Sequence, residues 1–457
     1  MIALLLVMAL AQQPADEAPA PTGSAEGRPA AADLSPLQTL IDRAAAGDRI
    51  IVPPGTYRGD LIVDRAIELI GSGRPLLKGS GRGSVVRIRA ANVTVDGFDI
   101  DGGGTGDLGR DTSGIHVNAP HATVRHCRIR GSLFGIYLRE SDDATVTDNV
   151  VNGIPGRPPG EIGSGIHVWN SQRFQLHRNV VIATRDGFYI QSSSHGFVTG
   201  NRASELRYGL HYMFSDDNVF EDNVFENSAA GAALMYSNRL VFRRNRFIHN
   251  RGFASVGLLL KACDAIVAED NVIADNARGV FLEGSSGNQF RRNVIAMSDT
   301  ALVVYDSATA NVFEGNAFIA NLSPLSLSGR RTDTRFDGNY WSDHDEPDLD
   351  GDGIADRPYR LSSVFDHLRG NLTAADLFSQ SAAASAIGAA ERIFPVLDPI
   401  PVVDARPLAH APQLPALPPS SSLASRSVAS EALPPFLLLI GCGLFAAAGR
   451  SPVRGRP

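Results

Sequence analysis

The chain has 457 residues, 43% of them apolar and 20% charged, with 42 basic against 49 acidic side chains. This length is enough for one large domain or two ordinary ones. The net charge of -7, without a basic block, argues against nucleic acid as a partner, because duplex binding needs clustered Lys and Arg. Three cysteines cannot all pair, which excludes a disulfide framework.

The N-terminal region predicts an exported protein. Residues 1–11 read MIALLLVMALA, an apolar run with a small-x-small end that is typical of a signal peptide. Residues 12–33 are rich in Pro and Ala and predict a disordered segment. Ser35 and Pro36 then supply N-cap and N1 chemistry for a short amphipathic helix ending near Gly47, which we expect to cap the folded domain.

The central region repeats about every 22 residues. One column of the repeat contains Phe98, Cys127, Asn149, Asn179, Asn201, Asn223, Asn245, Asn271, Asn293, Asn316 and Asn339. Most units then carry a G-φ-x-φ run, in which φ is apolar, as expected of a short strand. A unit of this length is too short for a helix pair but fits three short strands. The sequence therefore predicts an all-β fold, a right-handed parallel β-helix with a helical cap.

Two polar columns and two cysteines have structural explanations. Asn in the first column and Ser in a second, at Ser141, Ser171 and further coils, are expected to satisfy backbone groups at the bends. Cys127 replaces an Asn and Cys263 replaces a Ser, so we expect both to be small buried residues rather than ligands or nucleophiles.

The C-terminal region shows no repeat. We place the β-helix domain at residues 34–398 and a Pro/Ala/Ser-rich tail at 399–433. Residues 434–449 form a short apolar segment, below the roughly 20 residues of a membrane-spanning helix. It is either a sorting tail, a weak membrane anchor or a disordered apolar end.

Insertions and unusual side chains mark one side of the predicted rod. The long insertions all fall between the Asn column and the following Gly, and loops on one face of a solenoid usually form its binding rim. Beside them, the variable residue of G-φ-x-φ must point outward. In successive coils it is His116, Tyr137, His167, Tyr189 and His211. Such residues are uncommon on a solvated face.

Sulfur ligands lie beside this column. Met213 and Met235 are predicted neighbours in adjacent coils, and His211 precedes Met213 by about 6.6 Å along the strand. Thioethers and imidazole form a soft ligand set suited to Cu(I). His167, two coils or roughly 10 Å away, is a further ligand candidate. The alternative is an apolar docking patch, since Met and aromatic residues also enrich protein interfaces.

An acidic loop near the end of the repeat predicts a calcium site. Asp348, Asp350, Asp352 and Asp356 place carboxylates at alternating positions beside Gly residues, like the first half of a calcium loop without its closing Glu. The alternative is a solvated acidic turn.

Catalysis has little support in the sequence. Candidate groups are Arg185 with Asp186, and Asp216, Asp217 or Glu283. No matched acid pair recurs in neighbouring coils, so we expect no enzyme. Two other classes stay open: a carbohydrate-binding or polysaccharide-cleaving β-helix, and a structural or adhesive rod.

Five segments resemble the NosD family of nitrous oxide reductase maturation proteins. They are RDGFYIQSSS (185–194), LRYGLHYMFSDDNVFEDNVFENSAAGAALMYS (206–237), GLLLKACD (257–264), GNYWSDHDEPDLDGDGIADRPY (338–359) and ERIFPVLDPIPVVDARPL (391–408). The resemblance implies a periplasmic accessory protein without catalytic turnover, which handles copper for nitrous oxide reductase. It implies as partners an ABC transporter, made of an ATPase and a membrane subunit, and a membrane-anchored copper chaperone. The resemblance also implies membrane association through the transporter. The apolar segment 434–449 departs from the family pattern and leaves a second route to the membrane open.

Overall fold

The structure, a computed structural model, describes residues 36–104, 111–154, 156–252, 254–328, 332–361, 386 and 402–415. The chain separates into two units, residues 1–418 and 419–457, and all described residues belong to the first. The predicted signal peptide (1–11), the segment 12–33 and the apolar segment 434–449 lie outside the described residues. The described residues include no helix long and apolar enough to cross a membrane.

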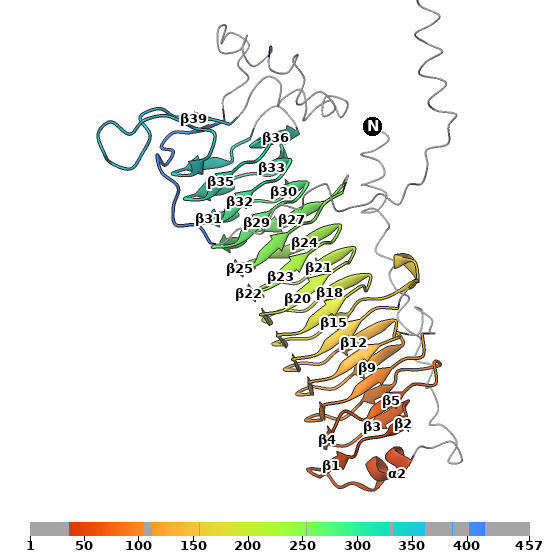
Figure 1. Ribbon diagram of the computed structural model, residues 1–457. Helices are drawn as coiled ribbons and strands as arrows, with labels where there is room; N and C mark the ends of the chain where they lie inside the picture. Colours follow the sequence, from red (N-terminus) through yellow and green to blue (C-terminus); the bar gives the residue numbers. More distant parts are fainter. Residues whose placement is uncertain are drawn as a thin grey trace, which may run out of the picture. The chain divides into compact units, whose positions relative to one another are not determined.

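Three sheets form the faces of a β-helix, because successive coils add short strands to each sheet (Figure 1). The strands pair in parallel except β39 and β40, which pair antiparallel. Within the described residues sheet 1 has 15 strands. Their order is β1 (Arg49–Val52), β4 (Glu68–Gly71), β7 (Thr94–Asp96), β10 (Thr123–Arg125), β13 (Thr145–Thr147), β16 (Gln175–His177), β19 (Phe197–Thr199), β22 (Val219–Glu221), β25 (Val241–Arg243), β28 (Val267–Glu269), β31 (Gln289–Arg291), β34 (Val312–Glu314), β37 (Arg335–Asp337), β40 (Val403–Asp404) and β39 (Tyr359–Arg360).

Sheet 2 contains the second strand of each coil. Its order is β2 (Thr56–Arg58), β5 (Leu76–Lys78), β8 (Asp99–Asp101), β11 (Arg128–Arg130), β14 (Val150–Asn152), β17 (Val180–Ile182), β20 (Arg202–Ser204), β23 (Val224–Glu226), β26 (Arg246–Ile248), β29 (Val272–Ala274), β32 (Val294–Ala296), β35 (Ala317–Ile319) and β38 (Tyr340–Trp341).

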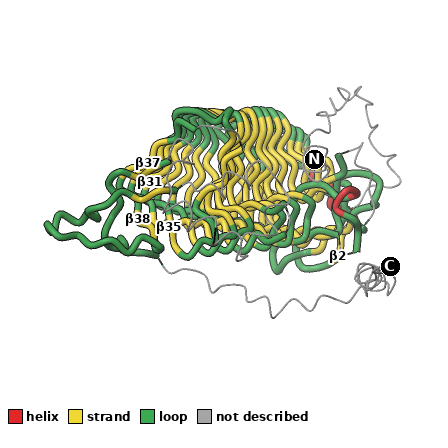
Figure 2. Tube along the Cα trace, turned by 90° about the horizontal axis from the view of Figure 1, so that it is seen from above, coloured by secondary structure: helices red, strands yellow, loops and turns green. Residues whose placement is uncertain are grey.

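Sheet 3 contains the G-φ-x-φ runs. Its order is β3 (Leu61–Val63), β6 (Val86–Ile88), β9 (Ser113–Val117), β12 (Phe134–Arg139), β15 (Ile166–Trp169), β18 (Asp186–Gln191), β21 (Tyr208–Met213), β24 (Ala230–Asn238), β27 (Val256–Asp264), β30 (Arg278–Glu283), β33 (Thr300–Tyr305) and β36 (Leu325–Ser328). The strands of successive coils pair in register, and Figure 2 shows them side by side along the stack. The predicted parallel β-helix is confirmed.

The helix α2 (Pro36–Arg43) covers the N-terminal end of the stack (Figure 1). It buries Leu37 and Ile41, whereas Leu40 is 55% exposed. Gln38 binds the open strand edge, because its amide donates to the Ile62 carbonyl at 3.0 Å and accepts from the Ile62 N–H at 2.8 Å. The helix thus satisfies backbone groups that an uncovered coil would leave unpaired.

The Asn column forms a continuous hydrogen-bonded ladder inside the stack. From Asn149 to Asn339 each side-chain amide donates to the Oδ1 of the next Asn at 2.9–3.1 Å. The same Oδ1 also accepts the backbone N–H of the preceding Asn, as Asn201 does from Asn179 at 2.9 Å. Each bend therefore satisfies its buried polar groups through the next coil.

The two cysteines in the repeat are buried, as expected. Cys127 lies below Asn149, whose Oδ1 accepts its backbone N–H at 2.9 Å, and Cys263 bonds in the same way to the Ser285 hydroxyl at 3.0 Å. Burial raises the pKa of both thiols to about 12, so neither is a thiolate near neutral pH.

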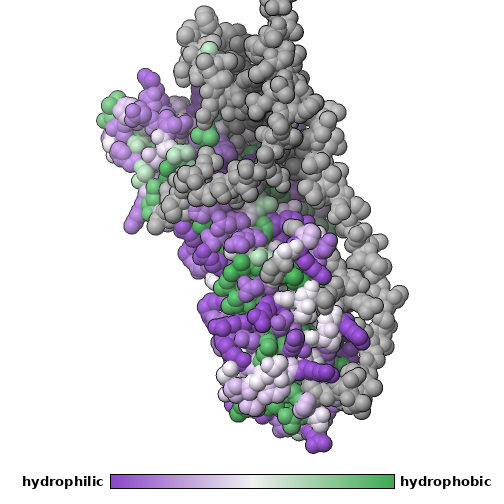
Figure 3. Space-filling view, turned by 45° about the vertical axis from the view of Figure 1, so that its right-hand side comes forward, coloured by the Kyte–Doolittle hydropathy of each residue, from purple (hydrophilic) through white to green (hydrophobic). Residues whose placement is uncertain are grey.

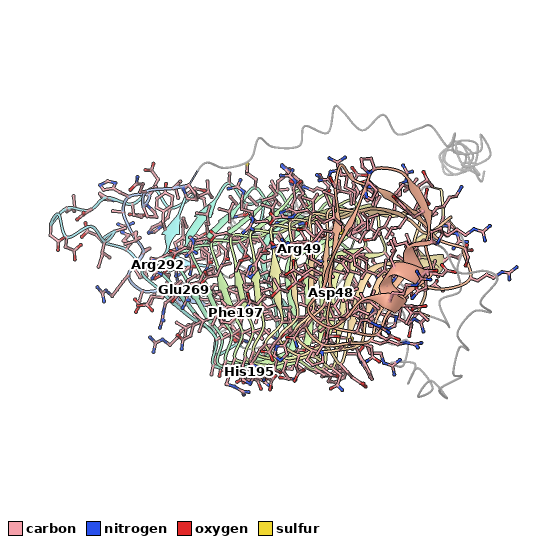
Figure 4. All side chains as sticks on the ribbon, turned by 90° about the horizontal axis from the view of Figure 1, so that it is seen from below. Asp48, Arg49, His195, Phe197, Glu269 and Arg292 are labelled. Carbon is pink, nitrogen blue, oxygen red and sulfur yellow. The ribbon has the colours of Figure 1, made fainter. Side chains whose placement is uncertain are left out.

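Arg and Asp alternate at the outer bends of sheet 1. Five pairs join neighbouring coils, and both partners of each pair have positive φ: Asp143–Arg173, Asp148–Arg178, Asp217–Arg239, Asp222–Arg244 and Asp270–Arg292. Arg292 also lies 3.8 Å from Glu269, and the two side chains project from the same side of the stack (Figure 4). Hydrophilic residues dominate the face in Figure 3, where apolar residues form separate patches.

A distant segment completes the C-terminal end of the Asn ladder. Asp404 in β40 is fully buried and accepts hydrogen bonds from the Asn339 side chain at 2.9 Å, the Asn339 N–H at 2.9 Å and the Trp341 indole at 3.1 Å. The described residues 402–415 of the expected tail thus include a strand that pairs with β37 and β39.

Candidate copper site on the third sheet

A continuous ladder of aromatic rings runs along the outer face of sheet 3. His116, Tyr137, His167, Tyr189 and His211, here called the ring ladder, occupy one register column in five successive strands. Neighbouring ring centroids lie 5.0, 4.4, 4.5 and 4.4 Å apart in this order. The apolar residues that alternate with them, such as Ile166 and Val168, face the core. The predicted direction of the column is therefore correct.

The first part of the ring ladder is nevertheless not an open surface. His116, Tyr137 and His167 are only 9%, 6% and 8% exposed. Phe134 packs against both Tyr137 and His167, with ring centroids 5.6 and 5.5 Å away. The insertion between β14 and β15 contributes Ile154 and Ile162 to the same apolar cluster and contains the short helix η3 (Pro159–Glu161). Expecting these rings on an exposed binding face was therefore wrong.

Burial keeps two of the histidines neutral. It lowers the pKa of His116 to about 4 and the pKa of His167 to about 3. Both ring nitrogens of His167 and Nδ1 of His116 lack a hydrogen-bond partner among the described residues. A neutral imidazole keeps a lone pair for a metal near pH 7, so protons would not compete for these nitrogens.

The two methionines lie side by side, as the spacing predicted. Met213 and Met235 are register partners in β21 and β24, and His211 is on the same face of β21. The Met213 sulfur lies 3.8 Å from the Tyr189 hydroxyl, while the His211 ring stacks on the Tyr189 ring at 4.4 Å. Tyr189 therefore contacts both candidate ligands. Burial raises the pKa of Tyr189 to about 12, so it remains a neutral phenol.

His167 is separated from this group. In the register column Tyr189 lies between His167 and His211, and its ring contacts both. His167 and His211 cannot bind one ion unless Tyr189 moves. The structure thus brings together His211, Met213 and Met235 but leaves His167 one aromatic ring away.

Asp186 is a functional candidate that the sequence suggested only as a catalytic group. It is fully buried at the start of β18, where Arg207 donates to both of its oxygens and His211 Nδ1 lies 3.2 Å from Oδ2. Burial alone would raise the pKa of Asp186, but the hydrogen bonds and charges of His211 and Arg207 outweigh it and hold this pKa below its usual range. Tyr208, not Arg207, is the register partner of Asp186 one coil on, so the repeat did not mark this pair.

The other candidate catalytic carboxylates are bound in surface ion pairs. Asp216 and Asp217 both pair with Arg239, at 3.1 and 2.7 Å, and Glu283 pairs with Lys261 at 3.2 Å. Lys261 follows Met235 in the same register column, so a positive charge borders the thioether pair on one side.

The acidic loop between β38 and β39 stands away from the stack (Figure 2). Carboxylate oxygens of Asp348, Asp350 and Asp352 lie within 4.8 Å of one another. Backbone N–H groups of the loop, with Gly353 the strongest contributor, bond to Asp348 and hold the pKa of that carboxyl below its usual value. Asp356 accepts the Leu349 N–H at 3.1 Å, which fixes the far side of the loop. Clustered carboxylates of this kind suit a hard cation such as Ca²⁺.

Removal of Ca²⁺ is expected to lower the thermal stability of the chain. A cation bound only to the folded state stabilises it by about 2.7 kcal/mol when its free concentration is 100 times Kd. Melting curves with Ca²⁺ and with a chelator measure this difference. The Asp350→Asn, Asp352→Asn double variant is the control and should melt alike in both conditions. Identical melting temperatures of the wild-type chain with and without Ca²⁺ would show that the loop is a solvated turn.

The chain is similar to known proteins of one family. Residues 152–346, which include the ligand group, match the family described as "Periplasmic copper-binding protein (NosD)". A "Probable ABC transporter binding protein NosD" of Pseudomonas aeruginosa is 29% identical over 402 residues, covering 84% of this chain and 93% of that protein. The protein of the same name from Stutzerimonas stutzeri is 28% identical, covering 86% and 92%. The chain belongs to the NosD family.

Solved structures share the fold of this NosD-family chain. The A-module of mannuronan C-5 epimerase AlgE6 from Azotobacter vinelandii aligns with a TM-score of 0.57, at 17% identity, covering 65% of this chain and 93% of that one. At this identity the likeness concerns the β-helix alone.

Proposed function

We propose that this NosD-family chain binds Cu(I) in the periplasm and passes it on for maturation of the copper centres of nitrous oxide reductase. Its relatives are named as ABC transporter binding proteins, and its family is described as periplasmic and copper-binding. On this proposal the chain works with the ATPase and membrane subunits of such a transporter. A membrane-anchored copper chaperone supplies or receives the ion.

The register of Met213 and Met235 is the observation that carries the proposal. Parallel strands in register place the two thioethers on neighbouring strands about 4.8 Å apart at the backbone. His211 adds an imidazole on the same face, and Tyr189 contacts both His211 and Met213. Flexible methionine side chains can close around one soft ion, and three soft or borderline ligands favour Cu(I) over hard cations.

The same surface suits a site that releases its ion. Met213, Met235 and His211 are each partly exposed, unlike His116 and His167. A neutral thioether binds Cu(I) without adding charge, so a partner with a stronger ligand set can take the ion over. Transfer of this kind needs no catalytic group on the chain.

Packing of the ring ladder disfavours the carbohydrate alternative. Each ring packs against its neighbours in the column, and the first three members are nearly buried, so these three leave no open ring face for a sugar. The described carboxylates considered for catalysis are engaged by Arg or Lys.

Metal analysis of the purified protein tests the proposal. After incubation with Cu(I) and removal of unbound ion, we expect copper to remain bound, and we expect cells that lack the chain to make a copper-poor reductase. Incubation with Mg²⁺ is the control and should leave no metal on the ligand group. Two results together would contradict the proposed function: no copper bound to the purified chain, and a fully loaded reductase in cells that lack the chain.

A further inference from the structure

Asp186 and Arg207 form a buried charge pair beside the proposed copper ligands. Arg207 Nε donates to Oδ1 at 2.9 Å and Nη2 to Oδ2 at 2.7 Å, and the Asp186 side chain has no exposed surface. Arg185 adds a further contact, 3.4 Å from Oδ2. Burial of such a pair costs desolvation free energy that its Coulombic attraction often fails to offset, so it is weak evidence of a purely stabilising role. The pair also contacts His211, which indicates a role in positioning that side chain.

The surroundings of His211 Nδ1 define which ring nitrogen carries the proton. Asp186 Oδ2 lies 3.2 Å from Nδ1, and Arg207 Nη2 lies 3.4 Å from it. Arg207 Nη2 has two N–H groups, of which one donates to Asp186 at 2.7 Å, so the carboxylate is the closer polar neighbour of Nδ1. If Nδ1 were unprotonated, its lone pair would face the carboxylate oxygen, and the two would repel each other. A proton on Nδ1 instead makes a charge-assisted hydrogen bond.

Aromatic neighbours fix the plane of the same ring. Tyr189 stacks on His211 with an interplanar angle of 22°, and Tyr208 meets it edge-on with ring centroids 5.1 Å apart. Arg207 in turn lies over the Tyr208 ring at 4.4 Å. The imidazole is thereby held between two rings with Nδ1 on Asp186. Within the described part of the chain Nε2 has no hydrogen-bond partner.

We propose that Asp186 is a positioning residue, which holds His211 with its proton on Nδ1 and leaves the Nε2 lone pair free for the copper ion. This inference rests on the proposed function. A carboxylate that accepts the second N–H of a ligating histidine sets its tautomer, orients its ring and makes the ligating nitrogen more basic. Arg207 holds the Asp186 carboxylate in place through two hydrogen bonds. Asp186 and Arg207, from two neighbouring coils, thus support the copper ligand His211 from behind.

The tautomer of His211 in the metal-free protein gives the first test. With ¹⁵N-labelled histidine and the His211→Gln variant for assignment, NMR should show a proton on Nδ1 and none on Nε2. This measurement needs no copper and no change at Asp186. A wild-type His211 that carries its proton on Nε2 would overturn the inference.

The Asp186→Asn variant gives the second test. Loss of such an outer carboxylate typically weakens metal binding roughly 10–100-fold, and we expect that loss in a Cu(I) chelator competition. Asp217→Asn is the matched control, because it removes the carboxylate that pairs with Arg239 at the surface. This variant should keep wild-type affinity for Cu(I). Unchanged affinity in Asp186→Asn overturns the inference. A wild-type chain that binds no Cu(I) refutes the proposed function instead, while the tautomer measurement still reports on Asp186.

Discussion

Replacement of both Met213 and Met235 by leucine is expected to abolish most of the Cu(I) affinity without unfolding the chain. Leucine and methionine are close in volume, and such swaps usually cost less than about 1.5 kcal/mol. Loss of a residue that only supports a ligand weakens metal binding roughly 10–100-fold. Loss of two direct ligands should weaken Cu(I) binding by more than this. A chelator competition measures the affinity, and the copper content of the reductase from the same cells measures delivery.

Two features of this experiment separate ligation from simple contact. Leucine keeps the apolar area, so a partner that only docks on this patch should still bind the double variant. Met297→Leu is the matched control, because Met297 packs with the apolar cluster on sheet 2, away from His211. A double variant with unaltered Cu(I) affinity and a fully loaded reductase would show that the methionines only pack or dock.

The fold could be predicted from the sequence because its stabilising groups repeat. Asn179, Asn201 and their equivalents recur at the coil length, and the side chain of each bonds to the next coil and to a carbonyl of the preceding one. The register of Met213 with Met235 followed from the same repeat, since residues one coil apart must be neighbours. Such one-coil relations are the interactions that a repeat shows directly in the sequence.

Interactions outside the repeat could not be predicted. The burial of His167 depends on Phe134 and on an insertion, and neither the repeat nor the hydrophobic pattern shows how an insertion packs. Asp186 differs from its column neighbours Tyr208 and Ala230, so no periodic signal marked it. Its role appears only when the directions of the Arg207 and His211 side chains are known.

Asp404 is the clearest case of a partner supplied from a distance, and its loss is expected to loosen the C-terminal coils. Its carboxylate accepts two hydrogen bonds from Asn339 and one from Trp341, and Gly338 N–H adds another at 3.2 Å. Hydrogen bonds to a charged group contribute about 1.5–3 kcal/mol each, and buried donors left without an acceptor are costly. Asp404→Ala should therefore destabilise this end by at least about 3 kcal/mol.

Hydrogen exchange locates this effect, because coils of a repeat fold open locally from their ends. In Asp404→Ala the amide protons of Asn316 and Asn339 should exchange faster, while those of Asn179 and Asn201, far along the ladder, should keep their protection. Asp404→Asn retains one acceptor oxygen and should give an intermediate loss. Unchanged exchange at Asn339 would mean that the ladder ends stably without Asp404, and uniform loss of protection along the chain would mean that the coils unfold as one unit.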